Sequence, residues 1–219
     1  MATFNFLGRY QSGSTVQLAL SPHIPPTSNN LAVIPKDWED YSGNIIYDGD
    51  PQICFLDYAI THSGSPSIRL EPHTIADRNV AREVDGRWLP IKAGDVIQYG
   101  CWIKTDPLPP GYTVTPPYGG GGRICFDYYD SIGYIPFKDS EVAKYTGWWY
   151  DLPNNYVPYD SNWVWRGAKV VVPETLIDNN GVARHPSSVV LWVQVWDVYA
   201  GMIPNANAWF ADTELYINP

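Results

Sequence analysis

The chain has 219 residues, the length of one all-β domain, and charged residues make up only 17% of it. Aromatic residues reach 15%, with ten Trp and sixteen Tyr, which excludes a disordered chain or a coiled coil. The formal net charge of −9 argues against a nucleic-acid partner, because phosphate binding requires clustered Lys and Arg, and no stretch approaches the ~20 apolar residues that span a bilayer.

The N-terminal segment differs in charge from the rest of the chain. Residues 1–36 contain no Asp or Glu, and residues 14–20 alternate polar and apolar side chains as a strand does. The first residues, MATFNFLGRYQSG, lack the long apolar core of a signal peptide, so we expect a soluble chain without membrane insertion. We expect residues 1–34 to form a strand or arm packed on its own domain or on a neighbouring subunit, and residues 35–219 to form the main domain.

The next elements are strands rather than helices. Twenty Pro and eighteen Gly interrupt any long helix, and the strongest periodic segments alternate every second residue. We predict strands at residues 66–71, 80–84, 95–105, 123–129 and 189–197. One side of each of the clearest strands is apolar, and these sides carry Ile68, Leu70, Ile97, Tyr99, Cys101, Ile103, Ile124, Phe126, Tyr128, Val189, Leu191, Val193 and Val195. The pattern predicts an all-β fold, a two-sheet antiparallel β-sandwich with long loops.

The opposite side of the same strands mixes aromatic rings, amides and a few charges. This mixture suits sugars, because flat pyranose faces stack on aromatic rings while hydroxyl groups need polar donors and acceptors. The alternative is that Trp102, Trp192 and Trp196 lie under the loops as a second small core. The candidate carbohydrate-binding residues on these strands are Arg69, Glu71, Gln98, Trp102, Arg123, Asp127, Tyr129, Trp192, Gln194 and Trp196.

Two long irregular segments, residues 107–122 and 140–165, are candidate binding loops, because long loops in compact domains usually carry function. The second contains Trp148 and Trp149, which we add to the candidate carbohydrate-binding residues. Aromatic loops of this kind also occur at subunit contacts, and both interpretations stay open.

The cysteine residues indicate neither a disulfide framework nor a metal site. Cys54, Cys101 and Cys125 cannot all pair within one chain, and none belongs to a Cys-x-x-Cys spacing. We expect them to be small buried hydrophobic residues.

Several segments, taken in order, resemble the jelly-roll carbohydrate-binding modules grouped around families 4, 9 and 22. They are PKDW at residues 35–38, THSGSPSIRL at 61–70, LPIKAGD at 89–95 leading into QYGCWIKT at 98–105, NWVW at 162–165 running to VVVP at 170–173, and AWFADTELY at 208–216. The resemblance implies two antiparallel sheets, one of which grips a xylan or β-glucan chain on a concave face. It also implies a packing role for Trp163.

The same resemblance implies a structural calcium ion on the side opposite the glycan. Asp212 matches a residue that is usually a calcium ligand, and the turn near Ser65 would supply a backbone carbonyl. Ala211 stands where the family has a further Asp, and residues 1–36 offer no acidic counterpart to the one near the family's N-terminal strand. Calcium prefers six to eight oxygen ligands, several of them carboxylates.

Candidate catalytic groups are few. Glu71 and Asp127 could share a sheet face as the carboxylate pair of a glycosidase, but the Glu-x-Asp-x-x-Glu signature of jelly-roll β-glucanases is absent. The four histidines form no metal spacing and pair with no candidate nucleophile, so we expect loop or surface roles for His23, His62, His73 and His185. We therefore expect no enzyme activity.

Two functions follow from these observations. The first is a non-catalytic carbohydrate-binding β-sandwich, extracellular or at the cell surface, that binds a β-linked polysaccharide or oligosaccharide of the xylan or glucan type in an aromatic-lined cleft. The alternative is a structural jelly-roll subunit of an extracellular filament, surface layer or virus particle, self-assembled through the N-terminal strand and aromatic loops. Glycan titration and light scattering distinguish the two.

Overall fold

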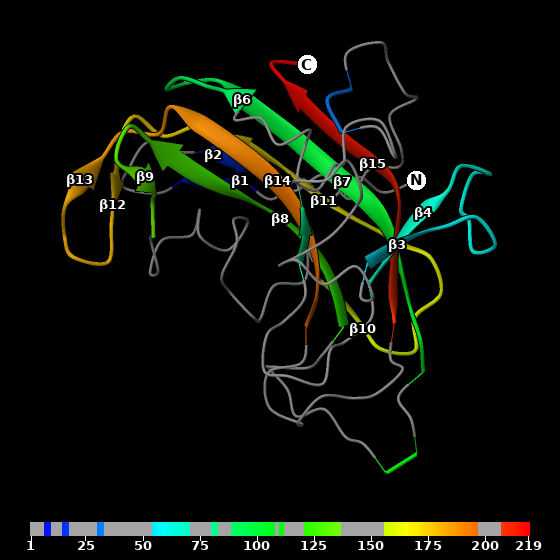
Figure 1. The fold of residues 1–219 in the computed structure, drawn as a ribbon. Helices are drawn as coiled ribbons and strands as arrows, with labels where there is room; N and C mark the ends of the chain where they lie inside the picture. Colours follow the sequence, from blue (N-terminus) through cyan, green and yellow to red (C-terminus); the bar gives the residue numbers. More distant parts are fainter. Residues whose placement is uncertain are drawn as a thin grey trace.

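The computed structural model describes residues 7–9, 15–17, 30–32, 54–70, 80–82, 89–107, 110–111, 121–136, 156–196 and 207–219. Strands connected by turns, without a helix, make up these parts of the chain (Figure 1). None of the described residues therefore forms a helix that is long and apolar enough to cross a membrane.

The strands form two large sheets and one small hairpin, and every pairing is antiparallel. The seven-stranded sheet has the order β1 (Leu7–Arg9), β2 (Thr15–Gln17), β11 (Val164–Val171), β7 (Val96–Thr105), β15 (Ala208–Ile217), β4 (Ser67–Leu70), β3 (Cys54–Asp57). The six-stranded sheet has the order β10 (Tyr156–Pro158), β8 (Gly121–Asp130), β14 (Ser188–Trp196), β5 (Val80–Arg82), with β6 (Leu89–Pro90) on β14 and β9 (Gly133–Tyr134) on β8. The hairpin consists of β12 (Leu176–Ile177) and β13 (Ala183–Arg184).

Eight of these strands make a jelly roll. In chain order they are β4, β5, β7, β8, β10, β11, β14 and β15, and the first pairs with the last, the second with the seventh, the third with the sixth and the fourth with the fifth. This nested pairing is that of one long antiparallel ribbon folded over itself into two sheets. It confirms the predicted two-sheet antiparallel β-sandwich.

The core lies between the two sheets and contains the apolar sides that alternation predicted. Ile97, Cys101 and Ile103 of β7 are fully buried, as expected, and Cys101 is a free thiol. Across the core, Tyr99 of β7 meets Phe126 of β8 edge to face, with ring centroids 5.0 Å apart. The side chains of the other two cysteines, Cys54 and Cys125, lie outside the described part of the structure.

The two sheets approach closely at Gly122, near the start of β8. A Cβ atom at this position would lie 2.6 Å from Cγ2 of Ile103 and 3.2 Å from the Cβ of Ala208, both from the facing sheet. Only a residue without a side chain fits this gap, because native cores have few voids into which neighbours can move.

Two strands fall in a region that the sequence did not mark as regular. The segment 140–165 was predicted to be irregular, but β10 occupies Tyr156–Pro158 and β11 begins at Val164. The sequence of β11 does not alternate clearly between apolar and polar residues. Arg166 occupies the inward position opposite Cys101, where an apolar residue would be expected, and Gly167 follows it. Pairing with β7 along eight residues compensates for this weak local pattern.

The described parts of the N-terminal segment lie on the domain's own seven-stranded sheet. Strand β2 pairs with β11, with Val16 opposite Val170, and β1 pairs with β2. Residues 30–32 lie beside β15, where the backbone N–H of Leu31 donates to the carbonyl of Leu215 at 2.9 Å.

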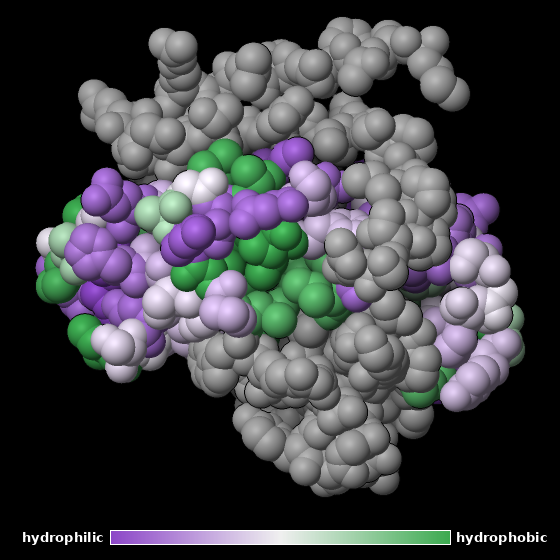
Figure 2. Space-filling model, turned by 90° about the horizontal axis from the view of Figure 1, so that it is seen from above, coloured by the Kyte–Doolittle hydropathy of each residue, from purple (hydrophilic) through white to green (hydrophobic). Residues whose placement is uncertain are grey.

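An ion-pair network holds the β12–β13 hairpin against the turn between β8 and β9. The guanidinium of Arg184 donates to both carboxylate oxygens of Asp130, at 2.5 and 2.6 Å, and lies 3.6 Å from Asp178. The hydrogen bonds from Arg184, above all, lower the pKa of Asp130 to about 2. The surface at this end of the molecule, at the left of Figure 2, is partly hydrophilic and partly hydrophobic. Its exposed apolar residues include Ile132, Ile177 and Val182.

Candidate functional site

The predicted site residues divide between two outer faces of the sandwich. Arg69 on β4 and Gln98 and Trp102 on β7 belong to the seven-stranded sheet, whereas Arg123, Asp127, Tyr129 and Trp192 belong to the six-stranded sheet. Each residue points away from the core that its own strand builds, and the two sheets share that core. The outer faces therefore point in opposite directions, and the prediction of one common binding surface is wrong.

The other predicted residues cannot be placed as side chains. Glu71, Trp148 and Trp149 lie outside the described residues. Gln194 and Trp196 are described as backbone only, with Gln194 opposite Arg123 and Trp196 opposite Gly121. Because Glu71 lies outside the described residues, the suggested carboxylate pair of Glu71 and Asp127 stays a prediction.

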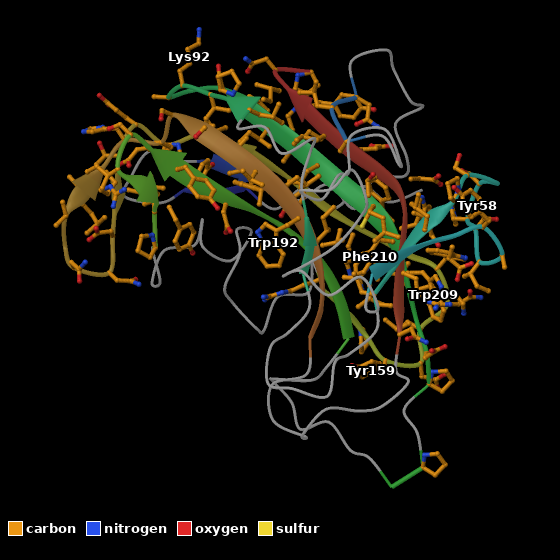
Figure 3. The ribbon with its side chains drawn as sticks, in the orientation of Figure 1. Tyr58, Lys92, Tyr159, Trp192, Trp209 and Phe210 are labelled. Carbon is orange, nitrogen blue, oxygen red and sulfur yellow. The ribbon has the colours of Figure 1, made fainter. Side chains whose placement is uncertain are left out.

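One end of the outer face of the six-stranded sheet is formed by Arg123 and Trp192. The guanidinium carbon of Arg123 lies 5.1 Å from the centroid of the Trp192 ring, which is a cation–π contact. Both side chains are almost covered, with 3% and 6% of their surface exposed. The indole N–H of Trp192 is buried and finds no hydrogen-bond partner among the described residues. Figure 3 shows Trp192 on the β8–β14 side and Trp209 on the β15 side, with Phe210 between them in this view.

The other end of this face carries two tyrosine rings. Tyr129 on β8 and Tyr134 on β9 meet edge to face with centroids 5.7 Å apart, and both are half-buried. Asp127, also half-buried, lies on the same face two residues before Tyr129. Because a strand rises about 3.4 Å per residue, the strip from Arg123 to Tyr129 is roughly 20 Å long. Its accessible part is the end with Asp127, Tyr129 and Tyr134.

The turn between β8 and β9 places Tyr134 beside Tyr129. Asp130 begins the turn by accepting hydrogen bonds from the backbone N–H groups of Ile132 and Gly133, at 2.8 and 3.2 Å. Gly133 has φ +129°, a conformation that favours glycine. Tyr134 could not be predicted from the sequence because β9 has only two residues, too few to show alternation.

On the opposite outer face, Trp102 belongs to a packed aromatic cluster. His62 stacks on its indole ring with centroids 4.1 Å apart and planes 19° apart, and Trp165 meets it edge-on at 5.9 Å. Trp163 contacts His62 edge-on at 5.5 Å, a packing contact of the kind expected for this residue. Like that of Trp192, the indole N–H of Trp102 is buried without a partner among the described residues. Because His62 covers one face of Trp102, that face is closed to a sugar ring.

Arg69 lies near the far edge of the same outer face. The Arg69 guanidinium lies 3.7 Å from Asp57, and Asp57 also accepts a hydrogen bond from the indole N–H of Trp209 at 2.9 Å. Lys104 lies over the Trp209 ring at 5.9 Å. These contacts connect β3, β4, β7 and β15.

Of the expected calcium ligands, Asp212 is engaged by two other side chains. Asp212 accepts hydrogen bonds on one carboxylate oxygen from Nδ1 of His62 at 2.7 Å and on the other from the hydroxyl of Ser63 at 2.5 Å. Ser65 is exposed in the same turn, and no group of three or more His, Cys, Asp or Glu among the described residues is arranged to hold a metal ion. Burial, and then the charge of Asp212, raise the pKa of Glu214 to about 7. These donors do not fit a calcium ion, which needs six to eight oxygen ligands.

Among known proteins, the chain is similar to several solved structures. No family model and no curated protein matches the chain. A family 16 carbohydrate-binding module aligns with 78% of this chain and 99% of its own, at 13% identity and a TM-score of 0.39. A family 30 carbohydrate-binding module of a cellulosomal cellulase from Clostridium thermocellum aligns with 86% of this chain and 92% of its own, at 18% identity and a TM-score of 0.41. Similarity at this level does not define a function.

Proposed function

We propose that this protein is a non-catalytic carbohydrate-binding β-sandwich, and that its binding face is the outer face of the six-stranded sheet. The observation that carries this proposal is the strip along β8, which has Arg123 and Trp192 at one end and Tyr129 and Tyr134 at the other. Asp127 lies between the two ends, and the backbone register places Gln194 and Trp196 on β14 beside Arg123 and Gly121.

The chemistry of the strip matches that of a sugar chain. Tyrosine rings offer flat apolar faces for pyranose rings, and the carboxylate of Asp127 can accept hydrogen bonds from ring hydroxyls. The accessible end of the strip offers Asp127, Tyr129 and Tyr134 to a sugar ring, whereas Arg123 and Trp192 at the other end are almost covered. A net charge of −9 favours a neutral or cationic ligand, which fits a polysaccharide of the xylan or β-glucan type. Such ligands imply an extracellular or cell-surface location.

The same face supports binding rather than hydrolysis. Glycoside hydrolysis requires two carboxyl groups about 5 to 10 Å apart. On the outer face of β8 and β14, Asp127 is the sole carboxylate among the described side chains. The neighbouring Asp130 accepts two hydrogen bonds from Arg184, which holds it in the turn.

Calorimetric titration of the full chain with soluble xylan, β-glucan and mannan tests this proposal. We expect binding to at least one of them, and we expect Tyr129→Ala and Tyr134→Ala each to weaken it about three- to tenfold, since one aromatic stacking contact contributes about 0.5–1.5 kcal/mol. Gln98→Ala is the matched control, because Gln98 lies half-buried on the opposite outer face, and we expect it to bind normally. No binding to any glycan by the folded protein would overturn the proposal.

A structural subunit remains the alternative prediction. The described pairing of β2 with β11 engages the N-terminal strand within its own chain, so this observation does not favour assembly by strand addition. Light scattering at micromolar concentration separates the alternatives: a monomer that binds glycan supports the proposed function, and a polymer without glycan affinity supports the subunit.

A further inference from the structure

Two segments that are distant in the sequence from β15 contact this strand at one irregularity. The pairing of β15 with β7 shifts register between Ala211 and Glu214, which marks a β-bulge. Asp212 within the bulge has φ +48°, a left-handed conformation that Asp tolerates better than most residues. The bulge therefore presents Asp212 in a position that a regular strand would not allow.

The first segment at the bulge is the turn between β3 and β4. Its residues His62 and Ser63 form hydrogen bonds with Asp212 of the bulge. Both carboxylate oxygens of Asp212 are used, one by Nδ1 of His62 and the other by the hydroxyl of Ser63. The side chain of Asp212 is 12% exposed and that of His62 is 25% exposed, so the hydrogen bond between these two is partly shielded from water, whereas Ser63 is exposed. Hydrogen bonds to a charged group in such a place are stronger than those between neutral groups.

The second segment, residues 30–32, binds β15 at and just after the bulge, through Thr213 and Leu215. The side chain of Asn30 donates to the carbonyl of Thr213 at 2.9 Å and accepts from the backbone N–H of Leu215 at 3.0 Å. The hydroxyl of Thr213 donates to the carbonyl of Ala32, which is fully buried. A bound cation is one way to hold such a junction, but here protein groups make the contacts.

We propose that Asp212, His62 and Ser63 form a cation-independent fastener that holds the β3–β4 turn on the bulge of β15 and seats the His62 ring on Trp102. A calcium ion would have to approach the Asp212 oxygens to about 2.3–2.6 Å, where Nδ1 of His62 and the hydroxyl of Ser63 now lie. An imidazole nitrogen suits transition metals and is not a calcium ligand. His62 is thus a positioning residue, and Trp102 is the ring that it covers.

Thermal unfolding of the full chain tests the fastener. We expect the Tm of the unchanged protein to be the same, within about 1 °C, in EDTA and in about 5 mM CaCl2, a concentration that fills even weak calcium sites. His62→Ala and Asp212→Asn should each lower the Tm by about 4–8 °C. The double variant should lose little more than the larger single loss, because both changes break the same interaction. His185→Ala, at an exposed histidine, is the control and should shift the Tm by less than about 1 °C.

Proton NMR of the histidine rings gives a second readout that needs no destabilised variant. Stacking on Trp102 at 4.1 Å should move the His62 ring resonances upfield of those of exposed His185. In Ser63→Ala, which removes one hydrogen bond and no packing, the upfield shift should become smaller. A rise of several degrees in the Tm on addition of calcium, absent in Asp212→Asn, would overturn the proposal. His62 resonances at the positions of an exposed ring would also overturn it.

Discussion

Arg123 and Trp192 lie on adjacent strands of the six-stranded sheet, with the guanidinium 5.1 Å from the indole centroid and both side chains almost covered. A cation held against an aromatic face and removed from water is stabilised more strongly than one at the surface. This pair therefore joins β8 to β14 through side chains as well as through the backbone ladder, and it closes one end of the proposed binding strip.

The contact between these two residues can be measured by a double-mutant cycle. We expect the single changes Arg123→Met and Trp192→Leu and the double change to give a coupling free energy of about 0.5–2 kcal/mol in urea unfolding. Trp192→Ala should cost more, about 3–5 kcal/mol, because it also leaves a cavity. A coupling near zero would show that the two side chains stabilise the protein independently.

The change Trp209→Phe should lower the stability of the protein without changing its affinity for glycans. The indole N–H of Trp209 donates to Asp57 at 2.9 Å, and Phe keeps the ring but removes the donor. We expect the free energy of unfolding to fall by about 1–3 kcal/mol, since a nearly buried carboxylate loses a hydrogen bond. Glycan affinity should not change, because Trp209 belongs to the seven-stranded sheet. Reduced affinity at normal stability would contradict the placement of the binding face.

Asp130 should give the protein a specific sensitivity to acid. Its pKa is lowered from 3.8 to about 2 in the folded state, so its contribution to stability is complete above pH 3.8 and is lost as the pH falls towards 2. Asp130→Asn should be less stable than the unchanged protein at pH 6, and its Tm should fall less steeply between pH 4 and pH 2. Circular-dichroism melts at several pH values test this, and parallel Tm profiles for the two proteins would refute it.

Gly122→Ala should strain the contact between the two sheets. The added Cβ would lie 2.6 Å from Cγ2 of Ile103, and forcing a methyl group into a packed core usually costs about 1–3 kcal/mol. Ile103→Ala removes that methyl group and should cost about 2–5 kcal/mol alone. The double variant should be more stable than the sum of the two losses predicts. Strict additivity in chemical denaturation would mean that the methyl group added at residue 122 does not press on Ile103.

The core could be predicted from the sequence because burial of one side of a strand is a local property. Ile97, Cys101 and Ile103 alternate within a single segment, and so do Ile124 and Phe126 on the facing strand, so each apolar side is visible without its partner. Tyr128 also followed this rule, although its hydroxyl lies in the core and burial raises its pKa well above the usual range.

The site could be predicted only in part, because alternation does not say to which sheet a strand belongs. Trp102 and Trp192 both point away from the core, and only the pairing of β7 with β15 and of β14 with β8 reveals that they occupy opposite faces. The resemblance singled out Asp212, but His62 lies 150 residues away in the chain, and no spacing pattern connects them.

The nested pairing of the jelly roll also governs the order in which the protein can fold. Strand β4 is the first of the eight strands to be synthesised, and its partner β15 is the last. Until β15 leaves the ribosome, one edge of β4 and one edge of β7 have unpaired backbone groups that can pair with other chains. Folding dominated by such distant contacts is slow. A chain that stops before Ala208 would therefore lose the strand that joins the beginning of the domain to its middle, and we expect it to aggregate rather than to fold in part.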